Sequence, residues 1–191
     1  FTILIVDDEP LVRGFLKDII LHLENLHVLE AEDGLEALDA VNKQKVDIVI
    51  TDINMPRLGG LELIQKIKEA NPLIPIAVIT GYPSIEVAVQ AMKEGASDFL
   101  IKPFNIEQLK LVIQKLINER SLLIENAQLN REVEQKKEIE RLNRVLTEKL
   151  RELGVLYKIG EILNESTLDR EVLMDKIVDL ALEVTEARKS S

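Results

Sequence analysis

Acidic residues follow two of the apolar runs in the first part of the chain. Asp7 and Asp8 come directly after Thr2–Val6, and Asp52 comes directly after Val46–Thr51. If both runs are parallel strands of one sheet, their carboxyl ends open into the same crevice and bring these carboxylates together. Mg²⁺ binds one or two carboxylates together with water and phosphate oxygens. The sequence therefore predicts a Mg²⁺ site that contains Asp7, Asp8 and Asp52.

A hydroxyl and a cation are found at two further strand ends. Thr80 follows the run Ile74–Ile79, and Lys102 follows Asp98–Ile101. A carboxylate can attack phosphorus and hold it as an acyl phosphate when cations neutralise the phosphoryl oxygens and a hydroxyl donates to one of them. Asp52 suits the nucleophile, with Lys102 and Thr80 as its partners. A single Asp at a strand end more often caps a turn or a helix, but five such side chains together favour chemistry.

The elements that must position these side chains alternate short β-branched runs with amphipathic helical stretches. Five runs are short and mostly apolar, as buried parallel strands are: Thr2–Val6, His27–Ala31, Val46–Thr51, Ile74–Ile79 and Asp98–Ile101. The pattern predicts an α/β domain with a five-stranded, parallel, doubly wound sheet. Because 191 residues exceed what one such domain needs, we expect one domain and an appendage.

Helix boundaries in this first part follow from its capping residues. We expect Pro10 to open the first helix, with one buried stripe of residues at a spacing of four: Leu11, Phe15, Ile19 and Leu23. Ser84 is expected to cap a helix over 85–94 that ends at Gly95, and Asn105 is expected to cap the helix that follows.

A long helix is predicted from Glu119 onward, where Pro is absent and Gly154 and Gly160 are the only glycines. One heptad register collects six apolar residues and has misfits at Lys149 and Gly160; its members are Ile139, Leu142, Leu146, Leu153, Leu156 and Leu163. A helix over 105–164 would be about 90 Å long, too long to pack on the first domain alone. We therefore expect a parallel homodimeric coiled coil.

The composition of the chain excludes several classes of function. The chain has a net charge of −10 and no Cys, which excludes thiol catalysis and a disulfide framework. Residues 119–191 hold 13 Lys and Arg against 16 Asp and Glu without a basic block, so we expect no direct nucleic-acid binding. No run resembles a signal peptide or a membrane span, so we expect a cytoplasmic protein without membrane contact. His22 and His27 are expected to be ordinary surface or packing residues.

Four segments resemble the receiver domain of bacterial two-component response regulators. They are Ile3-Leu4-Ile5-Val6-Asp7-Asp8-Glu9-Pro10, Thr51-Asp52-Ile53-Asn54-Met55-Pro56 with Gly59-Gly60, Ile79-Thr80-Gly81, and Lys102-Pro103-Phe104. The similarity covers residues 1–118, and the order and spacing of the segments make it specific. It implies a flavodoxin-like receiver domain.

The resemblance assigns roles to the residues at the strand ends. It implies that Asp52 accepts a phosphoryl group from a histidine kinase. It also implies that Asp8 binds Mg²⁺ directly, Asp7 mostly through water, and Asn54 through its backbone carbonyl. Such a protein is both substrate and catalyst of phosphotransfer and hydrolysis, rather than a conventional turnover enzyme.

A conformational switch is implied as well. Thr80 and Lys102 are expected to contact the phosphoryl group, which adds a charge of about −1.5 to −2 and draws the Thr80 hydroxyl inward. Phe99 occupies the place of an aromatic residue that turns inward in the family; its simpler interpretation is a buried strand residue. The family commonly has a cis peptide at the position of Lys102-Pro103, and the sequence leaves the isomer open.

The appendage resembles known signalling modules less closely than the first domain does. Residues 119–163 resemble a signalling helix, and residues 164–191 form a predicted helical segment, capped by Thr167 or Asp169. Together with residues 153–163, this segment resembles the opening helices of a GAF sensory domain. On this interpretation the output domain lies beyond Ser191. The simpler interpretation is a self-contained receiver with a dimerising helical tail.

Two other classes of protein share part of this pattern. A phosphatase of the haloacid dehalogenase type also combines an Asp nucleophile with Mg²⁺, Thr and Lys, but it places the nucleophile after the first strand and its acidic pair late. Here the pair Asp7-Asp8 comes first and Asp52 follows the third strand. The second class is a pseudo-receiver that has lost its chemistry and serves as a structural dimerisation module, although all five key positions are filled.

Overall fold

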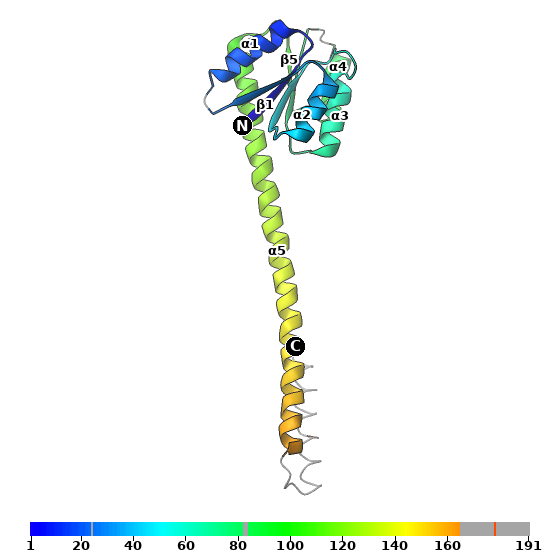
Figure 1. Ribbon diagram of the computed structural model, residues 1–191, viewed down its shortest axis with the longest axis vertical. Coiled ribbons are helices and arrows are strands. Elements are labelled where there is room, and N and C mark those ends of the chain that lie inside the picture. Colours follow the sequence, from blue (N-terminus) through cyan, green and yellow to red (C-terminus); the bar gives the residue numbers. More distant parts are fainter. Residues whose placement is uncertain (24, 82–83, 165–177, 179–191) are drawn as a thin grey trace. The chain divides into compact units, whose positions relative to one another are not determined.

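The computed structural model describes residues 1–23, 25–81, 84–164 and 178 (Figure 1). The chain divides into two compact units, Phe1–Gln128 and Leu129–Ser191. The first unit contains a sheet and its covering helices. Among the described residues, no helix combines the length and apolar character that a membrane span needs.

The first unit contains the predicted parallel sheet of five strands. Its strands are β1 (Thr2–Val6), β2 (His27–Ala31), β3 (Ile48–Thr51), β4 (Ile76–Thr80) and β5 (Asp98–Ile101), in the order β2-β1-β3-β4-β5. Both β3 and β4 begin two residues later than the sequence indicated. Before β4, Pro75 has no N–H group for a ladder, whereas its carbonyl accepts from Val49 N at 3.1 Å. Before β3, Asp47 is buried and accepts from Thr2 N, outside the sheet ladder.

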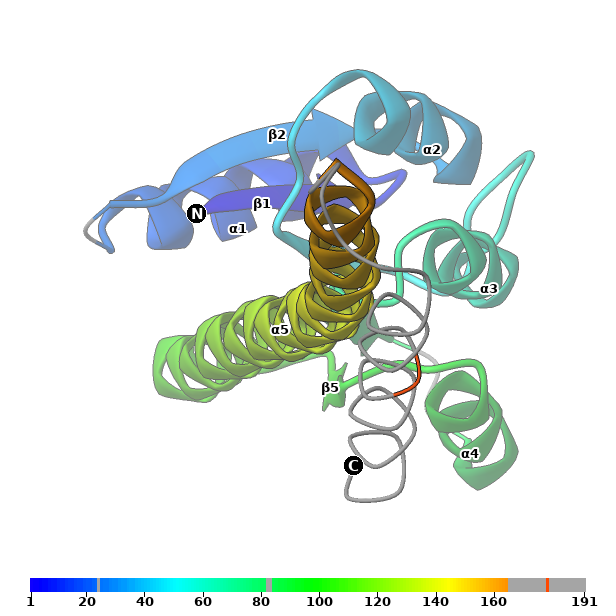
Figure 2. The same ribbon diagram turned by 90° about the horizontal axis from the view of Figure 1, so that it is seen from below.

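Helices cover both faces of the sheet and complete the predicted doubly wound fold. They are α1 (Pro10–Leu21), α2 (Gly34–Lys43), α3 (Gly60–Ala70), α4 (Ile85–Lys93) and α5 (Ile106–Asn164). The view in Figure 2 shows α2, α3 and α4 together on one side of the sheet. On the opposite face, α1 and the first turns of α5 share a core with the other side chains of the strands. The three central strands β1, β3 and β4 are therefore buried on both faces, which explains their nearly continuous apolar sequences, whereas the edge strands β2 and β5 are largely half-buried or exposed.

The predicted helix caps are present. Ser84 Oγ accepts from Val87 N at 3.1 Å at the start of α4, and Gly95 follows this helix with a φ of +104°. At the start of α5, Asn105 Oδ1 accepts from Gln108 N, while Gln108 Oε1 accepts from Asn105 N. This reciprocal pair is a capping box, and it fixes where α5 begins relative to β5.

The buried stripe predicted along α1 is wrong for two of its four members. Leu11 is 88% exposed and Phe15 is 47% exposed, whereas Ile19 lies in the core beside Leu16 and Ile20, and Leu23 packs against that core. Residues spaced strictly by four advance about 40° around the helix at each step, so a run of them leaves the buried face. Pro10 does open the helix.

The last helix runs without interruption from Ile106 to Asn164. Between residues 129 and 157 the second unit has many exposed apolar side chains, including Ile139, Leu142 and Leu146. The expected break and helical segment over 164–191, with its caps at Thr167 or Asp169 and its similarity to a GAF domain, lie outside the described residues except at Asn164 and Val178.

Candidate functional site

The three carboxylates singled out from the sequence meet at the carboxyl edge of the sheet. Val6 of β1 lies opposite Thr51 of β3, so the residues that follow these strands are neighbours. One carboxylate oxygen from each of Asp7, Asp8 and Asp52 lies within 4.8 Å of the other two. Asp7 and Asp52 are buried, whereas Asp8 is exposed.

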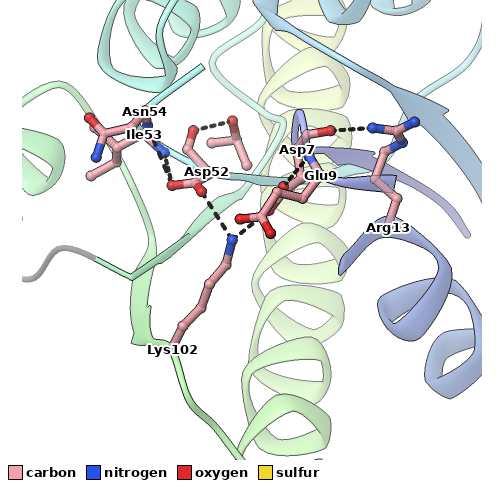
Figure 3. Close-up of polar contacts among 8 residues, drawn as sticks. Asp7, Glu9, Arg13, Asp52, Ile53, Asn54 and Lys102 are labelled. Carbon is pink, nitrogen blue, oxygen red and sulfur yellow. Dashed lines mark hydrogen bonds and ion pairs between the residues drawn. The ribbon is translucent and has the colours of Figure 1, made fainter. Parts of the chain in front are cut away.

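Lys102 reaches this cluster from the end of β5, across the end of β4. Its Nζ lies 2.7 Å from Asp7 Oδ2 and 3.0 Å from Asp52 Oδ2, and Figure 3 shows the ammonium group between the two carboxylates. Burial by itself lowers the pKa of Lys102, but the hydrogen bonds and charges of Asp7 and Asp52 outweigh burial and raise the pKa above its ordinary value of 10.5. The side chain is therefore a fixed cation at neutral pH.

Backbone groups orient the carboxylate of Asp52. Its Oδ1 accepts from Ile53 N at 2.6 Å and lies 3.4 Å from Asn54 N, while Oδ2 faces Lys102 (Figure 3). The loop after β3 returns close to this residue, because a Cβ atom on Gly60 would lie 2.0 Å from the Asp52 carbonyl oxygen. Only glycine fits there, so Gly60 allows α3 to start beneath the loop that carries Asp52.

Two neighbours of Asp7 were not singled out from the sequence. Glu9 N donates to Asp7 Oδ1 at 2.9 Å, and Arg13 Nη1 donates to the Asp7 carbonyl oxygen at 2.6 Å (Figure 3). The contact of Glu9 comes from its backbone, which no residue type reveals. Arg13 lies one turn into α1, and only the position of Pro10 as the helix start could have indicated that it faces the loop after β1.

The other expected site residues occupy the places that the strand order dictates. Thr80 is buried at the end of β4, and its carbonyl oxygen accepts from Lys102 N at 2.8 Å. Asn54 is exposed on the loop after β3, while Phe99 of β5 is partly buried against the core that contains α3 and α4. The Lys102-Pro103 peptide is cis.

His22 and His27 are exposed residues in the loop after α1 and at the start of β2. His27 lies opposite Thr2 at the start of β1, and His22 follows the C-terminal end of α1, whereas the carboxylate cluster follows the other end of β1 at Val6. Neither imidazole belongs to the group of side chains that could hold a metal ion in the described part of the chain.

The charges at this edge fit a hard divalent cation. Three carboxylates face one ammonium group, which leaves an excess of negative charge in a partly buried crevice. All of the side-chain donors are oxygens, which suits Mg²⁺ better than a softer metal. The exposure of Asp8 leaves one side of the cluster open to solvent, from which an ion with its water ligands can enter.

Comparison with known families identifies the family that has this arrangement of side chains. A family model described as the response regulator receiver domain matches residues 3–114. The chain belongs to the response regulator receiver family. Receiver domains of this family bind Mg²⁺ at an acidic pocket and are phosphorylated by histidine kinases. The haloacid dehalogenase alternative is thereby set aside.

Individual relatives support the same assignment. The transcriptional regulatory protein ZraR of Klebsiella oxytoca is 36% identical over 115 residues, which are 60% of this chain and 26% of that protein. The C4-dicarboxylate transport transcriptional regulatory protein DctD of Pseudomonas aeruginosa is 31% identical over 186 residues, 94% of this chain and 40% of DctD. A crystal structure of a response regulator receiver domain protein (CheY-like) from Methanospirillum hungatei JF-1 has a TM-score of 0.60 and 29% identity, covering 63% of this chain and 95% of that one. This receiver chain spans about a quarter to a half of the length of the curated relatives it matches.

Proposed function

We propose that the receiver accepts a phosphoryl group on Asp52 from a histidine kinase, in a reaction that depends on Mg²⁺. The observation that carries this proposal is the position of Lys102 Nζ, within hydrogen-bonding distance of both Asp7 and Asp52. A cation held beside a buried carboxylate can neutralise the charge of an incoming phosphoryl group. The orientation of Asp52 by backbone N–H groups leaves its Oδ2 facing that cation.

The transfer forms one bond and breaks one. An Asp52 carboxylate oxygen attacks phosphorus, the phosphorus–nitrogen bond to the kinase histidine breaks, and the electron pair leaves with the imidazole. Lys102 stabilises the negative charge of the phosphoryl oxygens, and the Thr80 hydroxyl donates to one of them. Hydrolysis by water later returns the free carboxylate and inorganic phosphate.

The residues present fit a Mg²⁺ ion. Asp7, Asp8, Asp52 and the backbone carbonyl of Asn54 would hold it, with water supplying the remaining ligands. When bound, the ion supplies positive charge that offsets the excess of carboxylates and the charge of the phosphoryl group. Within the chain itself, Asp7 also positions Lys102 through the hydrogen bond to its Nζ.

Phosphorylation is proposed to shift an existing conformational equilibrium. The new phosphoryl oxygens draw the Thr80 hydroxyl toward Asp52, and Phe99 turns inward into the space that Thr80 leaves. Phe99 is partly buried beside the core on the α3 and α4 side, so its movement changes the surface formed by α4, β5 and α5. Because α5 continues beyond the sheet, it can carry this change along the chain.

We further propose that the chain consists of three parts: a receiver over 1–118, a signalling helix over 119–163 and a helical segment over 164–191. The signalling helix forms a parallel homodimeric coiled coil through Ile139–Leu163. Its exposed apolar side chains and the similarity of DctD over 186 residues support a role for the helix beyond covering the sheet. The start of a GAF domain in the last segment stays a prediction from the sequence.

The experiment that tests the phosphoacceptor uses the intact mass of the full chain after incubation with a small acyl-phosphate donor and Mg²⁺. The wild type is expected to gain one phosphoryl group, and Asp52→Asn is expected to gain none because an amide does not attack phosphorus. Asp18→Asn, an exposed acid on α1, is the matched control and is expected to gain the group. Equal phosphorylation of Asp52→Asn would reject the assignment, and no gain in any protein would favour a pseudo-receiver.

A further inference from the structure

Six of the exposed apolar side chains of α5 beyond residue 138 form one continuous stripe, while Val145 and Leu156 lie outside it. At about 100° per residue, these six fall within a sector roughly 80° wide that contains no polar residue. We call this set the α5 stripe; it consists of Ile139, Leu142, Leu146, Leu150, Leu153 and Tyr157. All six are exposed, with relative accessibilities from 53% to 71%.

The stripe has a repeat of eleven residues rather than seven. Its steps of three, four and four residues bring each position back after eleven, as from Ile139 to Leu150. A heptad that starts at Ile139 would instead place Lys149 on the stripe and leave Leu150 beside it. On a straight helix a heptad drifts by about 20° per repeat, so Leu156 lies about 40° beyond Leu142 and outside the sector. The eleven-residue repeat therefore accounts for these six apolar side chains without a charged member.

We propose that this stripe is the interface with a second copy of the chain, aligned in parallel, and that its register is eleven residues. The proposal rests on the proposed dimer and specifies which side chains form it. At 11/3, or about 3.67 residues per turn, such a pair is nearly straight with a slight right-handed twist, in contrast to a heptad coiled coil. Leu150 lies in this interface and Lys149 lies outside it.

A parallel copy suits the stripe because every member meets its own counterpart. The charges beside the stripe agree with this occupant. Glu138 and Lys149 lie along one border, while the opposite border carries Asn143 and Gly154. Two-fold symmetry places the first border of one chain against the second border of the other, so each charge meets a neutral residue. No repulsion between like charges opposes the pair.

The interface begins at Ile139. Upstream, Leu129 and Val133 fall about 80° to 120° away from Ile139 around a straight helix, so they do not extend the same stripe. Residues 134–138 are all polar. Their side chains pair within the helix, as Lys137 does with Glu134 and Arg141 does with Glu138. These intrahelical pairs support the helix without needing a partner.

The test uses disulfide cross-linking, because the chain has no Cys of its own. Single Leu150→Cys and Lys149→Cys variants of the full chain are oxidised under identical mild conditions, after titration confirms that both thiols react. A disulfide requires Cβ atoms about 3.5 to 4.5 Å apart, so Leu150→Cys is expected to cross-link at least about tenfold faster than Lys149→Cys. Leu142→Cys and Leu153→Cys are both expected to cross-link, which an antiparallel pair cannot achieve at two symmetric positions.

Each other outcome overturns a defined part of this account. Faster cross-linking of Lys149→Cys would replace the eleven-residue register by the heptad and leave the proposed dimer in place. Cross-linking at only one of Leu142→Cys and Leu153→Cys would overturn the parallel alignment. A monomer mass for the wild type in sedimentation equilibrium, with no cross-linking at any position, would overturn the proposed dimer itself and leave phosphorylation of Asp52 as a separate question.

Discussion

The two ends of the sheet each hold a buried ion pair, but their charges are balanced differently. At the carboxyl edge, Lys102 faces Asp7 and Asp52 with Asp8 close by, so negative charge is in excess. At the amino edge, Arg120 Nη2 lies 3.4 Å from Asp47 Oδ1 and the exposed Lys45 Nζ lies 4.0 Å from the same oxygen, so the single anion is fully matched by positive charge.

At the amino edge, both residues of the pair make further hydrogen bonds, although the buried Arg120 Nε has no partner among the described residues. Arg120 Nη1 donates to the Leu73 carbonyl oxygen at 2.7 Å, and Asp47 Oδ2 accepts from Thr2 N at 3.0 Å. Both side chains are buried. These bonds join α5 to the start of β1 and to the segment before β4. The comparison indicates that the amino edge holds the fold together, while the carboxyl edge keeps an excess of negative charge, as the proposed binding of a divalent cation requires.

The largest effect on stability is expected from breaking the balanced pair. Arg120→Met leaves Asp47 without its buried cation and with only the exposed Lys45 beside it, which should cost about 3 to 5 kcal/mol. Native-state hydrogen exchange of the amides in β3 measures this as a loss of protection. Lys115→Met is the matched control, because Lys115 lies on the same helix as Arg120 and pairs with Asp98 of β5 but is 59% exposed; its replacement should cost about 0 to 1 kcal/mol. Similar losses for both variants would contradict a structural role for the buried pair.

A smaller effect of opposite sign is expected at the carboxyl edge. Asp8 makes no side-chain hydrogen bond or ion pair with the residues that the structure describes, so Asp8→Asn removes repulsion without removing a contact. Without metal, this variant should be more stable than the wild type by about 0.5 to 1 kcal/mol. In calorimetry, Mg²⁺ at ten times its dissociation constant should stabilise the wild type by about 1.4 kcal/mol and Asp8→Asn by less. A variant that is destabilised without metal would contradict the excess of negative charge.

The smallest expected effect is the pH dependence of the unfolding free energy that Lys102 contributes, which is negligible near neutral pH. Because its pKa is raised, the stability gained from its charge is fully present below the ordinary value of 10.5 and is lost as the pH rises through the higher folded value. The difference in unfolding free energy between the wild type and Lys102→Met should therefore be constant from pH 6 to 9 with respect to this group and shrink above about pH 10.5. Urea unfolding over this pH range measures it, and a decline between pH 7 and 9 would indicate a lowered pKa instead.

The carboxyl edge could be predicted from the sequence because each of its side chains is marked by its immediate neighbours in the chain. Each functional side chain directly follows an apolar run, and parallel strands place such positions at one edge of a sheet. The positions of Asp7, Asp52 and Lys102 follow from that rule alone. The close approach of Gly60 to Asp52 does not, because it depends on the path of the loop after β3.

The amino edge could not be predicted because its partners are far apart in the sequence. Asp47 and Arg120 are separated by 73 residues, and neither type nor spacing links them. Asp47 lay inside a predicted strand, where an acidic residue gives no signal of its partner. Arg120 lay beyond the predicted end of the receiver at 118, in a stretch rich in charges. Only the packing of α5 on the sheet brings the two side chains together.

Chemical identification of the phosphorylated residue tests the central claim most directly. The full chain is treated with Mg²⁺ and a small acyl-phosphate donor and then with borohydride, which reduces an aspartyl phosphate to homoserine. Tandem mass spectrometry of the digested protein locates the changed residue. The account predicts homoserine at position 52 and unchanged Asp7 and Asp8. Homoserine at either of those positions, or a phosphoryl group on another residue type, would contradict it.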